Sequence, residues 1–307
     1  MAGTPHAVGP TLTREEEHVA QQHQPVDPRT PPPLGSLPAV ARVDDVALRV
    51  VAGNPSPMTL DGTNTYLLGT PGRGTVAVVD PGPDTAAHLA AVEAAAAQLD
   101  AEPCAVLVTH HHVDHREAAP SWAARWGVPV VAARPDVAGP DGRVVADGDV
   151  LELGGLEIDV VATPGHTRDS LSFRLPTGAL CTGDHLLGRG TTVVAHPDGD
   201  LAAYLDSLRR VLDLGPDLLL PGHGPEMGED PAAVVRFHEE HRAMRVAQVR
   251  DALASGATDA RAVVEQVYTD VDRRLWGAAE ASTRAALDLL AQRGEVELRD
   301  GRARLVP

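Results

Sequence analysis

The sequence predicts a mixed α/β protein (α+β in its layout) in which two groups of strands form packed sheets with helices on their outer faces. Three observations support this class. Short runs rich in β-branched and aliphatic residues occur in two batches, separated by glycine and proline clusters. Segments with the apolar spacing of helices lie between and after these runs. The chain has 307 residues, whereas single domains commonly have about 100 to 200, so a second, smaller unit is also expected.

The first 40 residues differ in composition from the rest of the chain. They are rich in proline, glutamine and charged residues, and three consecutive prolines occupy positions 31–33. They show no sustained apolar period, and segments of this composition cannot bury enough apolar surface to fold. We therefore predict a disordered Pro-rich tail over residues 1–40.

The first batch of strands begins at Val46. Consecutive strands are predicted at residues 46–51, 64–69 and 75–80. Asp84 can cap a helix with one apolar face, formed by Leu89, Val92, Ala96 and Leu99. The apolar run 104–109 then predicts a strand buried on both sides, which completes a β-α-β unit.

The second batch follows the same order more loosely. A helix is predicted over residues 116–126, then strands at 128–132, 156–163, 171–175 and 179–182, a helix over 201–214 and a strand at 217–220. No internal repeat of fixed short period is visible. The two batches therefore predict two sheets in one domain rather than an array of repeats.

The chain after residue 229 predicts a separate helical unit. Asp230 and Pro231 open a long helix to about residue 254, and Gly256 is placed to end it. Two further helices are predicted over residues 260–268 and 278–292. Asp300 and Gly301 then join two alternating segments as a hairpin. Helices followed by a hairpin indicate a small winged-helix-like domain.

Composition excludes several classes of protein. No apolar run approaches the ~20 residues of a membrane span, and the N-terminus lacks the apolar stretch of a secretory signal, so we expect a cytoplasmic protein with no membrane partner. All 26 basic residues are arginine, which excludes lysine chemistry. Cys104 and Cys181 each lie in an apolar run, and buried free thiols are predicted for both.

The net charge of −17 opposes non-specific binding to nucleic acid, because that binding depends on neutralised phosphates. The charge is unevenly distributed. Residues 240–307 contain 11 arginines and 11 acidic residues, so the whole acidic excess lies upstream of them. The C-terminal part could still approach an anion.

The strongest chemical signal is THHHVDH at residues 109–115. His110, His112 and Asp114 recur at spacing two directly after a predicted strand, with His115 adjacent. In extended backbone alternate side chains share one side, so the first three would converge while His115 points toward a neighbouring position. Imidazole and carboxylate groups bind Zn²⁺, which lowers the pKa of its bound water to about 7. One segment could therefore serve two metal ions.

Three more candidate ligands each end a predicted strand beside a glycine. They are His166 in ATPGHT, Asp184 in CTGDH and His223 in LLLPGHG. Loops at strand ends commonly assemble functional sites, and glycine permits the sharp turn that brings a short ligand close. We expect these three residues to complete the metal site.

In order and spacing, these motifs resemble the metallo-β-lactamase superfamily, whose pattern of His-x-His-x-Asp-His followed by a distant His, Asp and His is filled at all seven positions. The resemblance implies a four-layer αββα sandwich with two Zn²⁺ ions per chain at one edge between the sheets; Mn²⁺ or Fe²⁺ could occupy the same ligands. By this resemblance the first ion is held by His110, His112 and His166, the second by Asp114, His115 and His223, and Asp184 bridges them.

Asp80, in VVDPG at a predicted strand end, matches the family's upstream aspartate, which supports the ligands by hydrogen bonding. A turn residue is the alternative interpretation. The predicted layout is then a tail over 1–40, a metallo-β-lactamase-fold catalytic domain over 41–229 and a winged-helix-like domain over 230–307.

A narrower resemblance spans about residue 46 to the C-terminus. The segments NPSPMTLDGTNTYLLG (54–69), HLLGRGTTVV (185–194) and PGHGP, together with the C-terminal unit, are similar to a subgroup of β-lactamase-like hydrolases that includes a mitochondrial single-strand endoribonuclease. The resemblance implies attack by a metal-bridging hydroxide, with Asp114 orienting it or accepting its proton.

Two substrates compete for this chemistry. Single-stranded RNA is placed first because the C-terminal unit accompanies the motifs. An ester or thioester is the alternative, since the net charge of −17 and an aromatic content of 3% disfavour RNA. Hydrolysis of β-lactams or glutathione thioesters is less favoured, as is DNA binding through a set of C-terminal arginines, namely Arg284, Arg293, Arg299, Arg302 and Arg304. A homodimer through the C-terminal unit is a further possibility.

The other histidines are expected to have structural roles. His111 should point away from the ligands by the period-two rule, and His185 should line the pocket. His238 and His241 lie on the predicted long helix, where we expect them to be exposed or hydrogen-bonded rather than metal ligands.

Overall fold

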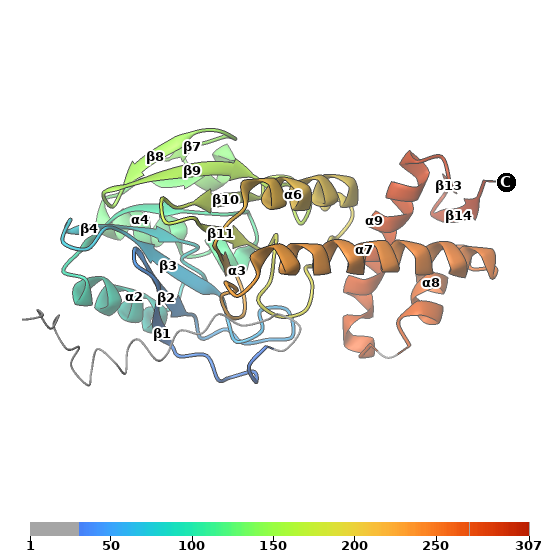
Figure 1. Cartoon of the computed structure of the whole chain (residues 1–307), viewed down its shortest axis with the longest axis horizontal. Helices are drawn as coiled ribbons and strands as arrows, with labels where there is room; N and C mark the ends of the chain where they lie inside the picture. The colour runs from blue at the N-terminus through green and yellow to red at the C-terminus, as the bar shows by residue number, and fades with distance from the viewer. Residues whose placement is uncertain (1–30, 270, 307) are drawn as a thin grey trace, which may run out of the picture.

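The structure is a computed structural model that describes residues 31–269 and 271–306. Two β-sheets pack face to face, and helices cover the outer face of each (Figure 1). This confirms the predicted four-layer αββα sandwich. Most of the predicted tail, residues 1–30, lies outside the described residues, and the first strand begins at Val40.

Within the described residues the first sheet has seven strands in sequence order. They are β1 (Val40–Asp44), β2 (Ala47–Val51), β3 (Asn64–Leu68), β4 (Thr75–Val79), β5 (Glu102–Leu107), β6 (Val130–Ala132) and β7 (Arg143–Val144). Strands β1 to β4 pair antiparallel, and β4 to β7 pair parallel. Parallel neighbours require crossovers, and the helices α2 (Ala86–Gln98) and α4 (Ala119–Trp126) lie in them.

The second sheet has the strand order β12-β11-β10-β9-β8. Its strands are β8 (Val150–Leu153), β9 (Leu156–Ala162), β10 (Leu171–Arg174), β11 (Ala179–Gly183) and β12 (Leu218–Pro221). All neighbours pair antiparallel except β11 and β12, which are parallel because α6 (Leu201–Leu214) lies in the crossover between them. Candidate ligands lie in the segments that follow the carboxyl ends of β5 and β11.

The core between the sheets is apolar and closely packed. Leu68 and Leu107 from the first sheet share it with Ile158 and Phe173 from the second, and each of these side chains is fully buried. Trp122 of α4 is buried against the outer face of the first sheet. Burying apolar surface stabilises by about 25 cal/mol per Å², so these layers fix the strand ends from which the site is built.

The C-terminal unit is connected to the sandwich by one long helix (Figure 1). It consists of α7 (Pro231–Ala254), α8 (Ala260–Val267), the 3-10 turn η1 (Arg273–Leu275), α9 (Trp276–Gln292) and the hairpin β13 (Val296–Arg299) and β14 (Arg302–Leu305). Asp300 and Gly301 both have positive φ, at 49° and 75°, as the predicted tight turn requires. Apolar residues of α6, α7 and α9 form one continuous core, for example Leu208, Val235 and Leu290.

Several elements differ from the sequence prediction. Thr85 rather than Asp84 caps α2, since its side chain accepts a hydrogen bond from the His88 amide. The helix predicted over 116–126 is two helices, α3 (Val113–Arg116) and α4. Short elements without a sustained apolar pattern were not predicted, namely β1, β7, β8 and α5 (Pro135–Ala138).

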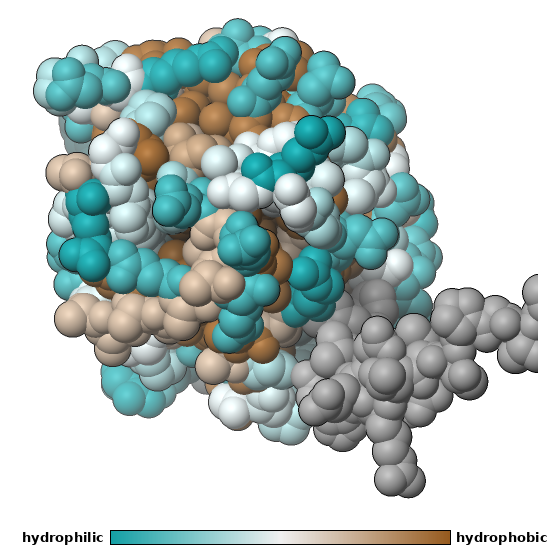
Figure 2. Space-filling view, turned by 90° about the vertical axis from the view of Figure 1, so that its left-hand side faces the viewer, coloured by the Kyte–Doolittle hydropathy of each residue, from teal (hydrophilic) through white to brown (hydrophobic). Residues whose placement is uncertain are grey.

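Both cysteines are free thiols; Cys181 is buried as expected and Cys104 is half-buried. Among the described residues no helix is long and apolar enough to cross a membrane. Figure 2 shows the end of the sandwich that lies away from α7, α8 and α9, where hydrophilic residues are interspersed with apolar areas.

Candidate metal centre

The candidate ligands of residues 109–115 lie where β5 leads into α3. His110 and His112 precede the helix, and His112 is its N-cap. Asp114 and His115 lie within the first turn of α3, so the expected extended alternation does not hold for Asp114. The helical turn gives Asp114 and His115 directions that an extended backbone would not, and the ring of His115 lies beside that of His110, with ring centroids 4.2 Å apart. One segment can therefore supply ligands in more than one direction.

The first group of nitrogen atoms comes from His110, His112 and His166. The Nδ1 atom of His112 lies 3.1 Å from Nε2 of His110 and 3.0 Å from Nε2 of His166. His166 lies on the loop between β9 and β10, more than 50 residues further along the chain. The three atoms together can hold one metal ion.

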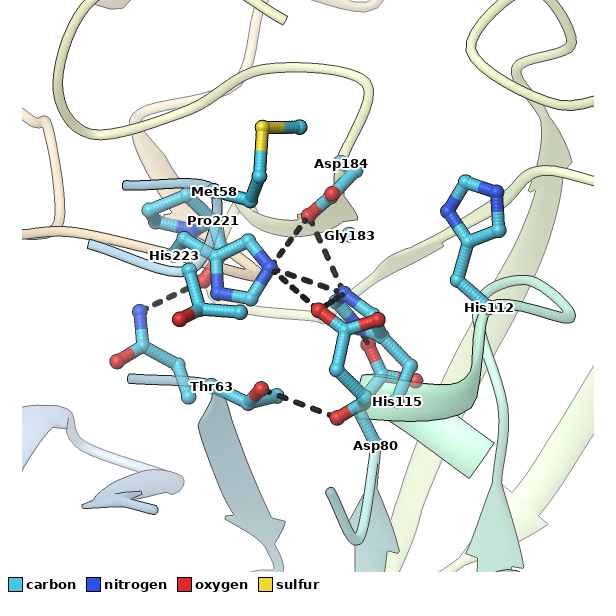
Figure 3. Close-up of polar contacts among 12 residues, drawn as sticks. Met58, Thr63, Asp80, His112, His115, Gly183, Asp184, Pro221 and His223 are labelled. Carbon is cyan, nitrogen blue, oxygen red and sulfur yellow. Dashed lines mark hydrogen bonds and ion pairs between the residues drawn. The ribbon is translucent and has the colours of Figure 1, made fainter. Parts of the chain in front are cut away.

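The second group consists of Asp114, His115 and His223. The Nε2 atoms of His115 and His223 lie 3.2 Å apart, and Oδ2 of Asp114 lies 3.3 Å from Nε2 of His223. His223 follows β12, so the second sheet contributes to this group as well as to the first. Figure 3 shows His115 and His223 converging from opposite sides of the site.

Asp184, which follows β11, lies between the two groups. Its Oδ1 is 3.4 Å from Nε2 of His115 and 3.5 Å from Nε2 of His223, whereas its Oδ2 is 3.6 Å from Nε2 of His166. One carboxylate thus directs one oxygen to each group. The structure brings all seven sequence-predicted residues together.

The donor atoms fit a metal of the zinc type. Ligand atoms at about 2.0 to 2.1 Å from one ion in tetrahedral geometry lie about 3.3 Å from one another. The nitrogen pairs at 3.0 to 3.2 Å are close to that spacing. Two imidazole nitrogens this close to each other share a proton or a cation, which also favours a metal ion here. Imidazole and carboxylate donors suit Zn²⁺, Fe²⁺ or Mn²⁺.

The histidines are held by hydrogen bonds from their other ring nitrogen. Nδ1 of His115 lies 2.8 Å from Oδ2 of Asp80, Nδ1 of His166 lies 2.6 Å from the carbonyl of Val193, and Nδ1 of His223 lies 3.1 Å from the carbonyl of Gly62. Since a carbonyl or carboxylate only accepts, Nδ1 donates in each case and Nε2 is left to face the site. Asp80 therefore contacts a candidate ligand rather than serving only as a turn residue.

Charge differs between the two groups. Burial is the main reason why the pKa of His110 and His112 lies below its usual range, at about 4 for His112. Burial also acts to lower the pKa of His115, but the carboxylates of Asp184 and Asp80 outweigh it and raise the pKa. Burial opposes ionisation of Asp184 as well, yet His223 and His115 hold its pKa well below the ordinary value. The first group is therefore neutral at pH 7, as ligands must be.

The glycines beside the ligands have a steric role. A Cβ atom on Gly222 would lie 2.6 Å from Oδ1 of Asp184 and 2.7 Å from Cε1 of His115. Gly165 has φ +141°, and a Cβ there would lie 2.3 Å from Cα of Tyr204. A larger residue at position 222 would displace candidate ligands, and one at position 165, next to His166, would collide with Tyr204 of α6.

The remaining histidines fall outside the seven. His111 points away from them, as expected, and its Nδ1 lies 2.7 Å from Oδ1 of Asp169. That contact was not predicted, because nothing local in the sequence joins residues so far apart. His185 is fully buried beside Tyr204, with ring centroids 5.0 Å apart, instead of lining an open pocket. His238 is also buried and contacts the Tyr204 hydroxyl.

Sequence comparison agrees with this geometry. The profile of the metallo-β-lactamase superfamily matches residues 58–223, and the profile of the β-lactamase-associated winged helix domain matches residues 260–303. The first match covers more than half of the chain and all seven candidate ligands. The chain belongs to the metallo-β-lactamase superfamily and is a hydrolase of that superfamily with a C-terminal winged helix domain.

Several relatives share most of its length. The Beta-lactamase-like protein 2 homolog of Drosophila melanogaster is 32% identical over 86% of this chain and 94% of its own. The atrochrysone carboxyl ACP thioesterase of Aspergillus chevalieri is 33% identical over 78% of both chains. A β-lactamase domain protein from Burkholderia ambifaria has a similar structure, with TM-score 0.76 and 25% identity over 89% of this chain and 96% of that one.

Proposed function

We propose that this protein is a metal-dependent hydrolase of acyl thioesters or related esters, with a binuclear zinc centre as its cofactor. The observation that carries the proposal is the position of Asp184, whose two oxygens face the two groups of ligands. His110, His112 and His166 would hold one Zn²⁺ ion, and Asp114, His115 and His223 the other. Bound zinc supplies Lewis acidity toward an acyl oxygen and a water nucleophile at neutral pH.

The protein's own side chains orient this chemistry. Asp114 is the most exposed acidic residue of the site, with 33% side-chain exposure against 13% for Asp184. Burial opposes ionisation of Asp114, but the hydrogen bond with His223 and the charge of His115 outweigh it and lower its pKa. Asp114 is therefore ionised at pH 7 and can orient water or accept its proton. Asp80 and the carbonyls of Val193 and Gly62 hold the imidazoles in place.

An acyl substrate is supported by the surface around the site and by a relative. Met58 and Val113 are apolar residues whose exposed fractions are 50% and 58%. Val113 lies between the candidate ligands His112 and Asp114 in the sequence. Figure 3 shows Met58 beside His223 and Asp184. An apolar rim suits the non-reacting part of an acyl group better than a phosphate backbone. The Aspergillus chevalieri relative is named as a thioesterase, which points to the same class.

Single-stranded RNA, placed first on the sequence, stays a prediction. The net charge of −17 still disfavours it. Three of the C-terminal arginines considered for DNA binding form ion pairs within the described residues: Arg284 with Glu280, and both Arg299 and Arg304 with Glu297. Such pairing reduces the charge available to phosphates. The cytoplasmic location and a homodimer are likewise predictions.

The decisive experiment compares zinc-loaded protein on acyl-coenzyme A thioesters and on end-labelled single-stranded RNA. His112→Ala and Asp184→Asn remove ligands, while His196→Ala changes an exposed histidine that pairs with Asp288 and is a matched control. We expect thioester turnover in the wild type and in His196→Ala, and a loss of at least about 100-fold in the ligand variants. RNA cleavage with the same pattern, without thioester turnover, would establish the nuclease function instead. Activity retained by a metal-free ligand variant would refute both.

A further inference from the structure

One side chain of the C-terminal unit reaches the loop that begins at Asp184. Arg242 lies in the middle of α7 and is 6% exposed. Its guanidinium donates a hydrogen bond to the backbone carbonyl of Thr192 and lies 5.3 Å from the centre of the Tyr204 ring. Arg242 thus connects α7 to a loop of the sandwich.

The loop of residues 184–194 contains one candidate ligand, Asp184, and contacts two others, His166 and His223. The hydroxyl of Thr192 donates to the carbonyl of Asp184 at 2.7 Å, which closes the loop on itself. The carbonyl of Val193 accepts from Nδ1 of His166 at 2.6 Å, and the amide of Gly188 donates to the carbonyl of His223 at 2.9 Å. A shift of Thr192 and Val193 would therefore be transmitted to Asp184 and His166.

The same loop is also held at its start. The hydroxyl of Tyr204 donates to the carbonyl of His185 at 3.0 Å. A hydroxyl has one hydrogen, so the contact of 3.1 Å with Nδ1 of His238 is a bond donated by His238. Tyr204 lies on α6 and His238 on α7, so both helices fix the residue next to Asp184.

Packing alone does not explain an arginine at this position. Arg242 has no ion pair with a carboxylate in residues 31–269 and 271–306, and its Nε atom has no hydrogen-bond partner there. Burying a charge without a counter-ion is costly, and an apolar side chain of similar volume commonly fills such a position with equal or greater stability. The groups that the guanidinium contacts are the carbonyl of Thr192 in the loop and the ring of Tyr204, which itself holds the loop at His185.

We propose that Arg242 is a positioning residue for the metal centre: through Thr192 and Val193 it fixes the loop of residues 184–194 so that Asp184 and His166 keep the spacing that metal ions require. The proposal rests on the proposed metal-dependent function of the site. It makes the C-terminal unit a structural part of the catalytic centre, since α7 supplies the residue.

Two variants interrupt the path at different points, and a third is a control. Arg242→Met keeps the side-chain length and removes the donor, whereas Thr192→Val keeps the shape and removes the hydroxyl that donates to Asp184. Arg236→Met changes an arginine of the same helix whose side chain is 55% exposed. Co²⁺ is added to each metal-free protein without substrate, and its affinity, stoichiometry and visible absorption spectrum are recorded. Melting temperatures of the metal-free proteins are measured in parallel.

We expect Arg242→Met and Thr192→Val to weaken Co²⁺ binding by about 10- to 100-fold and to change the absorption spectrum, with metal-free melting temperatures close to the wild type. Arg236→Met should match the wild type. Because Arg242→Met and Thr192→Val interrupt the same path, the double variant should have about the same Co²⁺ affinity as the single variant with the lower affinity. In thioester hydrolysis kcat should fall more than KM changes.

Unaltered Co²⁺ affinity and spectrum in Arg242→Met would overturn the proposal. So would additive losses in the double variant, or weaker binding that merely follows a lower melting temperature, since these indicate a general structural role. Co²⁺ binding is measured without substrate, so failure of the wild type to hydrolyse thioesters would refute the proposed substrate class and leave this result standing.

Discussion

A carboxylate oxygen of Asp80 lies 2.8 Å from Nδ1 of His115, so the residue that follows β4 orients an imidazole carried by α3. Asp80 also accepts from the amide and hydroxyl of Thr109, at 2.8 Å and 2.7 Å. It is 1% exposed and has a positive φ of 49°. Three donors thus converge on one buried carboxylate, and this network ties the segment of the candidate ligands to the first sheet.

Asp80→Asn should weaken metal binding at the group that contains His115. An amide accepts with its oxygen only. If the amide nitrogen takes the place of Oδ2, the bonds from His115 Nδ1 and from the Thr109 hydroxyl are both lost, and if it takes the place of Oδ1, the bond from the Thr109 amide is lost. We expect a decrease of about 10- to 100-fold in affinity for one of two zinc ions, measured by competition with a chelator. Asp84→Asn, at an exposed residue four positions later, is the control and should leave affinity unchanged. If Asp80→Asn also kept the zinc affinity of the wild type, Asp80 would have no role in the site.

Single ligand replacements should divide the centre into its two halves. His166→Ala removes a donor from the first group and His223→Ala removes one from the second, so each should retain about one zinc ion per chain. Asp184→Asn should reduce binding at both groups, because its oxygens face His166 on one side and His115 and His223 on the other. Metal content after gel filtration, measured by mass spectrometry, checks the prediction. Loss of a single ion in Asp184→Asn would contradict a bridging role.

Gly222→Ala should damage the site far more than its size suggests. The new methyl group would lie 2.6 Å from Oδ1 of Asp184, so the carboxylate must move. We expect catalytic turnover to fall by at least about 100-fold, since a displacement near 1 Å at a reacting centre has effects of that order. Gly277→Ala in α9 meets no atom within 4 Å and should be neutral or slightly stabilising. Wild-type turnover in Gly222→Ala would show that the ligands tolerate displacement.

The stability of the metal-free protein should fall as pH decreases from about 6.5 to about 4, in part because of His88. Burial lowers the pKa of His88 from 6.5 to about 4. The folded state therefore disfavours the charged imidazole, while the unfolded chain takes up the proton near pH 6.5. This contribution is fully present above that pH and decreases below it, by at most about 3 kcal/mol at pH 4.

His88→Gln tests this contribution, because the amide can still donate to the Thr65 hydroxyl that lies 2.8 Å from Nε2 of His88. Unfolding by urea, measured on chelated protein between pH 7.5 and pH 5, should show a weaker pH dependence in the variant. Parallel curves for the two proteins would show that His88 is not the source.

The sequence alone predicted the long elements and the ligand set. The helix over residues 201–214 and the helix from Pro231 to Ala254 match the structure, because capping residues and apolar spacing are local properties of the chain. The ligands could be named for a similar reason. Histidine and aspartate beside glycine at strand ends form a pattern that is visible without coordinates. Their grouping into two sets of three with a shared Asp184 came from the family resemblance, and the distances agree with it.

Other features depended on contacts between distant residues and could not be read from the sequence. Asp114 lies in α3 rather than in extended backbone, because packing overrides the alternation that a short segment suggests. The contact between His111 and Asp169 joins residues 58 positions apart. His185 was expected to line the pocket, yet it is fully buried beside Tyr204. His238 is hydrogen-bonded, as expected, but its partner, the Tyr204 hydroxyl, could not be read from the sequence.

The sequence by itself determined the superfamily, the candidate ligands and the order of the elements, because these follow from residue identity and local spacing. Only the tertiary structure decided that Arg242 of the C-terminal unit contacts the loop of Asp184, and that His115 is the candidate ligand that Asp80 contacts. The physical reason is the same in both cases. Hydrogen bonds between elements far apart in sequence form only when the sheets and helices have packed, and that packing depends on the whole apolar core rather than on any local pattern.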